Sequence, residues 1–235
     1  MHVLSRLRNS IYWRIRTFVD ASVRRRDFRA IFMASFGTQS RGTLHAVVIG
    51  CNSGQEVPFY RNFFARIDLV DPLIPQLKMH KSCNAMGVHL HPVAISSEVG
   101  VKQFFTASNG GESSSLLMPS HHRVEYPGIN FSEKEVPCCR LSDLDFVSDA
   151  TVLVLDVQGS EIDVLQSASA TGLSQLKVII CEYSLVPLYE GSANLSQIIS
   201  FLDARGFRLA FTTSPYISHS ECTGDAVFVR NDLFN

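Results

Sequence analysis

Carboxylates at the ends of predicted strands are the residues of this chain best suited to chemistry. Asp71, Asp156 and Glu182 each come at the end of a mainly apolar run rich in Val, Leu and Ile. Such runs suit parallel strands that are buried on both faces. Parallel strands end at one edge of a sheet, where open α/β sheets place their ligands. A carboxylate there can accept hydrogen bonds from a ribose diol or take a proton from a reacting hydroxyl.

A loop with two glycines stands before the first of these acids. The run Leu44–Ile49 predicts a buried strand, Gly50 ends it, and Gly54 allows a tight turn into a helix expected over residues 55–65. Glycine tolerates positive φ and lets a ligand approach the backbone closely. The N-terminus of the helix would point free N–H groups at that ligand. With Asp71 beside it, the loop predicts a nucleoside-cofactor site, and a turn without a ligand is the alternative.

The second site segment combines Asp156 with the start of a helix. An unpaired carboxylate at the end of a buried strand is unfavourable, which favours a functional role for Asp156. Ser160 and Asp163 have the spacing of a capping box at the start of a helix expected over 160–168. Glu161 lies in the first helical turn, where an acid also interacts favourably with the helix dipole. Glu161 therefore has a structural interpretation beside the catalytic one.

The order of predicted elements favours an α/β fold. Strands and helices alternate along the chain, which is typical of a parallel sheet covered by helices. Further strands are expected at 67–71, 88–95, 101–105, 136–141, 151–156, 176–183, 207–212 and 226–230, and further helices at 73–86 and 194–205.

Length and composition indicate a globular protein with one large domain. The 235 residues are 46% hydrophobic and 18% charged, with a net charge of −1. Residues 1–30 contain eight Arg and two Asp, so the remainder is acidic and gives no support for nucleic-acid binding. None of the six cysteines forms a C-x-x-C pair, which favours reduced thiols and a cytoplasmic location. No apolar run is long enough to predict a transmembrane helix.

The basic N-terminal segment, residues 1–36, is predicted to be an amphipathic helix. Its apolar face is formed at helical spacing by Leu4, Leu7, Ile11, Ile15 and Phe18. Three interpretations stay open. The helix could pack on the main domain, lie on an anionic membrane surface, or act as an organelle transit peptide. Membrane association of a cytoplasmic protein is thus one alternative.

At this point the sequence resembles a known family. The segment Leu155–Glu161, followed by Asp163-Val164-Leu165, resembles the signature of FkbM-type S-adenosylmethionine-dependent methyltransferases. The other matching segments follow in the family's order over residues 44–211: Ile49–Gln55, Asp71-Pro72, Pro92–Ala94, Gly111 with Ser113-Ser114, Glu182–Ser184 and Leu188–Gly191. Two positions depart from the pattern. Val48 replaces a frequent acid, and Asp71 replaces the usual glutamate.

The resemblance implies a class I methyltransferase (Rossmann-like) fold. We expect a seven-stranded, mostly parallel sheet with helices on both faces and the last strand antiparallel. Residues 37–235 would form this domain, with residues 1–36 as an extension. S-adenosylmethionine is the implied cofactor, and the implied acceptor is a hydroxyl on a sugar, lipid or natural product. No metal site is expected, because the histidine pairs at 89/91 and 121/122 lack matching acid or cysteine ligands.

Candidate site residues follow from the pattern and the resemblance together. The expected catalytic residues are Asp156, Glu161 and Glu182. The expected cofactor-binding residues are Gly50, Cys51, Asn52, Gly54, Gln55, Asp71, Pro72 and Ala94. Two other functions stay open. One is an NAD- or nucleotide-sugar-dependent enzyme, although Gly50-x-x-x-Gly54 fits G-x-G-x-x-G poorly. The other is a non-catalytic scaffold of the same fold.

Overall fold

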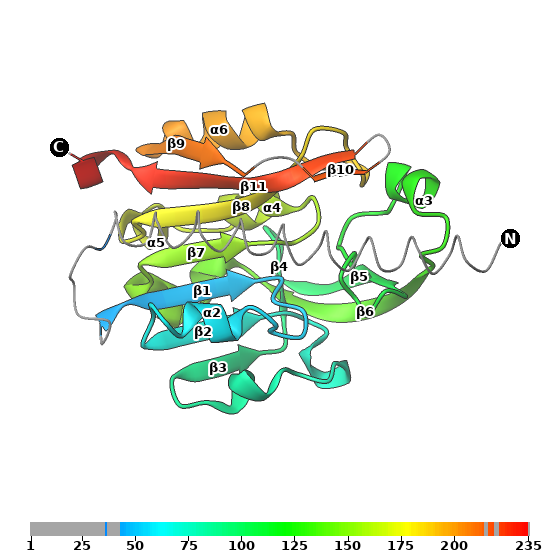
Figure 1. The fold of residues 1–235 in the computed structure, drawn as a ribbon, viewed down its shortest axis with the longest axis horizontal. Coiled ribbons are helices and arrows are strands. Elements are labelled where there is room, and N and C mark those ends of the chain that lie inside the picture. Colours follow the sequence, from blue (N-terminus) through cyan, green and yellow to red (C-terminus); the bar gives the residue numbers. More distant parts are fainter. Residues whose placement is uncertain (1–35, 37–42, 214–215, 219–220, 235) are drawn as a thin grey trace, which may run out of the picture. The chain divides into compact units, whose positions relative to one another are not determined.

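The main sheet follows the predicted α/β plan (Figure 1). The structure, a computed structural model, describes residues 36, 43–213, 216–218 and 221–234. The helix expected over residues 1–36 therefore lies, Phe36 aside, outside the described residues.

Eight strands form the main sheet in the order β10-β11-β8-β7-β1-β2-β3, with β9 also paired to β11. Because β9 and β10 both pair with β11, they share one edge position, and the sheet has seven positions. Strands β3, β2, β1, β7 and β8 are parallel, and β11 is antiparallel to β8. This confirms the class I methyltransferase arrangement. The strands are β1 (His45–Ile49), β2 (Arg66–Val70), β3 (Val88–His91), β7 (Val152–Leu155), β8 (Val178–Ser184), β9 (Phe207–Thr212), β10 (Tyr216–Ser218) and β11 (Glu221–Arg230).

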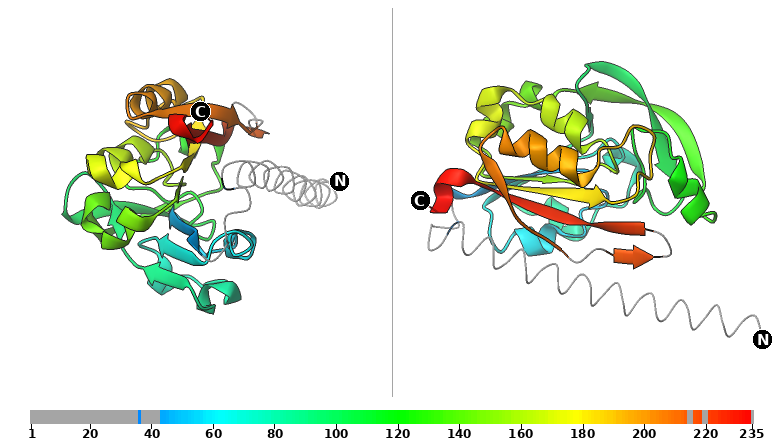
Figure 2. Two further views of the ribbon diagram at one scale, coloured as in Figure 1. Left: turned by 90° about the vertical axis from the view of Figure 1, so that its left-hand side faces the viewer. Right: turned by 90° about the horizontal axis from the view of Figure 1, so that it is seen from above.

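Helices cover both faces of this sheet. Helices α4, α5 and α6 lie on one face and α2 on the other (Figure 2). The central strands are apolar on both sides, and every residue of β1 and β7 is buried. The α-helices are α2 (Val57–Tyr60), α3 (His121–Glu125), α4 (Glu161–Gln166), α5 (Ala170–Ser174) and α6 (Leu195–Asp203). The 3₁₀ helices are η2 (Ile74–Gln76), η3 (Lys81–Asn84), η4 (Leu141–Asp143), η5 (Asp145–Asp149) and η6 (Asn231–Phe234).

A second, three-stranded sheet lies beyond the carboxyl ends of β1 and β2 (Figure 1). It consists of β4 (Ala94–Ile95), β6 (Phe131–Cys139) and β5 (Gly100–Ala107), in that order. Strands β5 and β6 are longer than the short strands expected at 101–105 and 136–141. The polar loop after β5 folds back on that strand, since Ser115 and Phe105 exchange backbone hydrogen bonds. The hairpin thus brings this loop toward the edge where ligands are expected.

Three predicted elements differ from the structure, and proline is part of the reason. The helix expected over 55–65 is reduced to α2, in which Pro58 stands in the first turn. The helix expected over 73–86 is wrong: two short 3₁₀ helices replace it, with Pro75 at the start of the first. The strand expected over 88–95 is interrupted at Pro92, which lacks the N–H that a ladder needs. Its two halves, β3 and β4, belong to different sheets.

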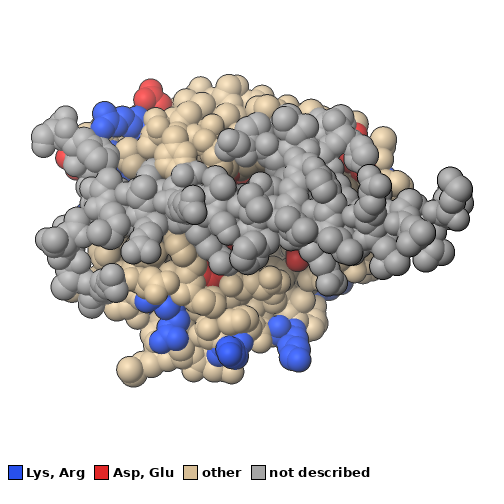
Figure 3. All heavy atoms as spheres, viewed as in Figure 1, with Lys and Arg blue, Asp and Glu red and all other residues tan. Residues whose placement is uncertain are grey.

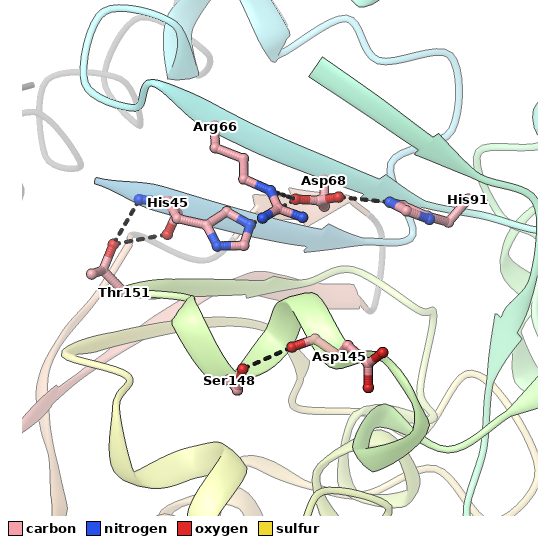
Figure 4. Close-up of polar contacts among 7 residues, drawn as sticks. All are labelled: His45, Arg66, Asp68, His91, Asp145, Ser148 and Thr151. Carbon is pink, nitrogen blue, oxygen red and sulfur yellow. Dashed lines mark hydrogen bonds and ion pairs between the residues drawn. The ribbon is translucent and has the colours of Figure 1, made fainter. Parts of the chain in front are cut away.

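A buried charged cluster connects the first three strands (Figure 4). Asp68 has no exposed surface. Its Oδ2 lies 2.7 Å from both His45 Nε2 and Arg66 Nε, and its Oδ1 lies 2.7 Å from His91 Nε2. Burial raises the pKa of Asp68, but the hydrogen bonds from His45, His91 and Arg66 outweigh burial and bring the pKa well below its usual value. The cluster therefore holds β1, β2 and β3 together through a charged carboxylate.

Surface charge is sparse on the face seen in Figure 3. Most of the described surface there is neither acidic nor basic, and separate Lys and Arg side chains lie along the lower rim. None of the described helices has both the length and the apolar character needed to cross a membrane.

Candidate active site

A pocket opens where β1, β2 and β7 end, at the edge that the sequence predicts. Five of the eight expected cofactor residues line it: Gly50, Asn52, Asp71, Pro72 and Ala94. The wall also contains apolar side chains, among them those of Val93, Ile95, Phe104 and Leu116. The pocket thus combines an acid with an apolar wall.

Gly50 is required by the close approach of two strand ends. Its φ is +81°, and a Cβ built on it would lie 1.7 Å from the backbone oxygen of Asp156. Any side chain at this position would therefore push β1 away from the segment that follows β7. The tight contact brings the glycine loop and Asp156 to one pocket.

Asp71 holds the glycine loop through its backbone. Its Oδ2 accepts a hydrogen bond from the N–H of Asn52 at 2.9 Å, and its Oδ1 accepts one from the N–H of Leu73 at 2.8 Å. Burial raises the pKa of Asp71, and these two N–H groups act in the opposite direction. Each carboxylate oxygen keeps a further lone pair, so the side chain can still accept hydrogen bonds from a ligand.

The polar loop after β5 contacts the glycine loop. The side-chain N–H₂ of Asn52 donates to the backbone oxygen of Gly110 at 3.0 Å. Gly111 and Ser114 line the pocket. Asn52 and Gly110 are 58 positions apart along the chain, so the glycine loop and the loop after β5 together form one wall of the pocket.

The other three expected cofactor residues are not among those that line the pocket. Cys51 is half-buried, and its thiol donates to the backbone oxygen of Asn52 at 3.6 Å. A Cβ on Gly54 would lie 2.4 Å from Cys83 Sγ, so this glycine serves packing within the loop. Gln55 is exposed and donates to Ser53 Oγ.

A second pocket adjoins the first, and Gln158 lines both. Glu161, Glu182 and Tyr189 contribute to the walls of this second pocket. The structure therefore divides the three expected catalytic acids. Asp156 faces the first pocket, whereas Glu161 and Glu182 line the second.

Gln158, which is not among the predicted site residues, connects these acids. Its Nε2 donates to Asp156 Oδ1 at 2.8 Å and to Glu182 Oε2 at 2.6 Å. Its Oε1 lies 3.2 Å from the hydroxyl of Tyr189. The backbone at Gln158 has φ +54°, which is uncommon for a residue with a side chain. Its position between Asp156 and Gly159 in the signature segment was the only sequence signal for this role.

Glu182 is the acid whose charge is most strongly disfavoured by its surroundings. Burial, followed by the negative charge of Asp156, raises the pKa of Glu182 well above its usual value. Asp156 itself is exposed. The two carboxyl groups therefore differ in environment although Gln158 bridges them.

Glu161 accepts hydrogen bonds from the backbone of the loop that carries Gln158. The residue is 3% exposed, and its Oε1 accepts hydrogen bonds from the backbone N–H groups of Gly159 at 3.1 Å and Val157 at 3.3 Å. Burial raises the pKa of Glu161 to about 7 despite these hydrogen bonds. The predicted capping box is wrong, because Ser160 makes no side-chain cap and Asp163 instead accepts from the N–H of Ser97.

Within the described part of the chain, no group of three or more His, Cys, Asp or Glu residues could hold a metal ion. Of the two histidine pairs noted in the sequence, His91 belongs to the Asp68 cluster and His121 lies 3.2 Å from Glu125.

Comparison with solved structures found methyltransferases. Magnesium protoporphyrin IX methyltransferase from Synechocystis PCC 6803 with bound SAM is 11% identical, with a TM-score of 0.47 and coverage of 89% of this chain and 80% of that chain. The 1,6-didemethyltoxoflavin-N1-methyltransferase of Burkholderia thailandensis, with S-adenosylhomocysteine, is 10% identical, with a TM-score of 0.46 and coverage of 90% and 89%. Mitomycin 7-O-methyltransferase MmcR is 11% identical, with a TM-score of 0.42 and coverage of 86% and 54%.

Comparison with curated proteins found no match. A family of protein domains does match, over residues 40–209, which include the glycine loop, all of the first pocket and all of the second except Thr223. Its description is "Methyltransferase FkbM domain". The chain therefore belongs to the FkbM family of methyltransferases.

Proposed function

We propose that this methyltransferase transfers a methyl group to a hydroxyl of a small molecule, such as a sugar, a lipid or a natural product. The observation that carries the proposal is the pair of adjoining pockets, one lined by Asp71 and one by Glu182, both of which lie in the FkbM match. Methyl transfer needs a donor and an acceptor side by side, and the two pockets meet at Gln158.

S-adenosylmethionine is the cofactor, and the residues of the first pocket fit it. Gly50 leaves the backbone accessible, Asp71 has lone pairs for a ribose diol, and the apolar wall at Ala94 and Phe104 suits an adenine ring. When bound, this cofactor supplies a methyl group activated by a positively charged sulfur. The task of the protein is to align that methyl group with the acceptor and to exclude water.

The three acids receive different roles in this proposal. A hydroxyl acceptor needs a base to take its proton. Glu182 lines the second pocket, and its Oε2 accepts from the side chain of Gln158, whereas Glu161 accepts from two backbone N–H groups. We therefore assign the role of the base to Glu182. Asp156 would position the cofactor or the acceptor from the first pocket. Glu161, which holds two backbone N–H groups, would support the loop that carries Gln158.

Ligand-dependent thermal stability tests the proposed cofactor. We expect S-adenosylmethionine and S-adenosylhomocysteine to raise the melting temperature and NAD to leave it unchanged. A ligand at 100 times its Kd stabilises the folded state by about 2.7 kcal/mol. Asp71→Asn should reduce the affinity for both adenosyl ligands by about 1.5–3 kcal/mol, the typical value of a hydrogen bond to a charged group. Stabilisation by NAD alone would contradict the assignment and favour the nicotinamide alternative.

We also propose that residues 1–36 form an extension outside the catalytic domain of residues 37–235, and that it binds anionic membranes from the cytoplasm. The eight arginines among residues 1–30 support this proposal. We expect the full chain to sediment with vesicles of anionic phospholipid, and salt to weaken the binding. A chain lacking residues 1–36 should stay folded and not sediment. If that truncated chain unfolds at much lower temperature, the segment is instead part of the core.

A further inference from the structure

The geometry points to Glu182 as a proton site controlled by the charge of the cofactor. Glu182 would give up its proton when the positively charged sulfur binds beside it, and would take the proton of the acceptor hydroxyl during transfer. This inference rests on the proposed function and specifies how its base is prepared.

The first observation is an accumulation of carboxylates around Glu182. Asp156 faces it from the end of β7, Glu161 from α4, and Asp225 from β11, where it is paired in register with Glu182. The hydroxyl of Tyr189 comes from the segment after β8. Among the described residues, no Lys or Arg lines either pocket. Within the described part of the chain, the junction of the pockets therefore has acids and no cationic side chain to balance them.

The second observation is the way in which Gln158 holds two of these acids. Its Nε2 has two hydrogens and contacts one oxygen of Asp156 and one of Glu182. The side chain thus fixes both carboxyl groups at the place where the two pockets meet. Its Oε1 lies 3.2 Å from the hydroxyl of Tyr189, whose single proton can be donated either to this oxygen or to the backbone oxygen of Ser113 at 2.8 Å.

The chemistry of methyl transfer puts a positive charge at the same place. The methyl group has to move from the first pocket to the second, so it must lie near Gln158. The sulfur that carries the charge is bonded to this methyl group. An opposite charge within about 4–6 Å of a carboxyl favours its ionised form. Without a cofactor, burial and the charge of Asp156 favour the protonated form of Glu182.

The proton and charge balance of the step is complete. The acceptor oxygen forms a bond to the methyl carbon, and the bond between that carbon and sulfur breaks, with its electron pair going to sulfur. The hydroxyl proton moves to the ionised Glu182. Sulfur loses its positive charge as Glu182 loses its negative charge, so the junction stays balanced. After product release, Glu182 again holds the proton that the next cofactor displaces.

Calorimetry of cofactor binding to the full-length protein tests this inference without an acceptor. S-adenosylmethionine and S-adenosylhomocysteine are each titrated at pH 7 in phosphate and in Tris, two buffers with different ionisation enthalpies. We expect binding of S-adenosylmethionine to release up to about one proton and binding of S-adenosylhomocysteine to release none. Glu182→Gln should bind S-adenosylmethionine without proton release, and Glu135→Gln, an exposed acid on β6, should behave as the wild type.

A second measurement on the wild type is independent of any variant. As the pH rises toward the pKa of Glu182, the affinity for S-adenosylmethionine should increase by up to about tenfold per pH unit, because binding releases a proton. The affinity for S-adenosylhomocysteine should stay constant over the same range. Equal proton release for both ligands, or a constant affinity ratio across pH, would overturn the inference while leaving the methyltransferase proposal intact. If neither adenosyl ligand binds, the proposed function itself fails.

Discussion

Replacing Glu182 with glutamine should lower the turnover of methyl transfer about 10²–10⁴-fold, the usual effect of removing a general base. The amide has nearly the same shape as the carboxyl group, and its oxygen can still accept the hydrogen bond from Gln158 Nε2. It cannot take a proton from a hydroxyl at neutral pH. The variant should therefore fold and bind cofactor while losing turnover.

The measurement is the rate at which S-adenosylhomocysteine forms, once a screen of sugars, lipids and natural products has found an acceptor. Melting temperature and cofactor affinity are recorded for every variant. Glu135→Gln provides the control on an exposed acid outside both pockets. Glu161→Gln tests the division of roles, because its oxygen can keep both backbone N–H partners and its turnover should change little. Wild-type turnover in folded Glu182→Gln would show that the base lies elsewhere.

Replacing Asp68 with alanine should destabilise the protein by about 3–5 kcal/mol, the typical effect of removing one partner of a buried ion pair. His45 is 4% exposed and would lose the partner of its Nε2, and its Nδ1 already has no hydrogen-bond partner. Arg66 can turn toward water, because 42% of its side chain is exposed. Most of the loss should therefore come from the buried imidazole and from the space left between β1, β2 and β3.

The pH dependence of the free energy of unfolding also reports the contribution of Asp68 to stability. The pKa of Asp68 is lower in the folded protein than in the unfolded chain, where it is about 3.9. Its contribution is present above that value and is lost as the pH falls below it. Chemical denaturation at pH 3 and pH 6 should show this loss in the wild type and a smaller one in Asp68→Ala. Asp149→Ala, which removes an exposed acid, is the control. Similar stability of Asp68→Ala and Asp149→Ala would show that the cluster does not stabilise the sheet.

The sequence could predict the central strands of the sheet and the residues of the first pocket that follow them. The runs that became β1 and β7 are apolar except at His45, so the burial of these strands on both faces follows from their residues. Gly50 was found because it directly follows β1, and Asp71 because it directly follows the mainly apolar end of β2. The helix expected over 73–86 does not form, because backbone N–H groups there are hydrogen-bonded to residues outside this segment. The N–H of Leu73 binds Asp71, and the N–H of His80 binds the oxygen of Ser53.

The part of the site that the sequence could not predict depends on contacts between distant residues. Gln158 meets Glu182 and Tyr189, which come 24 and 31 residues later. No periodic pattern or strand end marks a glutamine for this role. The Asp68 cluster was missed for a similar reason, since its histidines come from two other strands and meet the acid only through the register of the sheet.

The central claim is that the pocket at the carboxyl ends of β1, β2 and β7 holds the cofactor. A crystal structure of the protein with S-adenosylhomocysteine tests it most directly. We predict that the ligand lies in the pocket lined by Gly50, Asp71 and Ala94, with its ribose hydroxyls on Asp71 and its sulfur toward Gln158. A ligand bound elsewhere, or an empty pocket at a concentration that saturates binding in solution, would contradict this account.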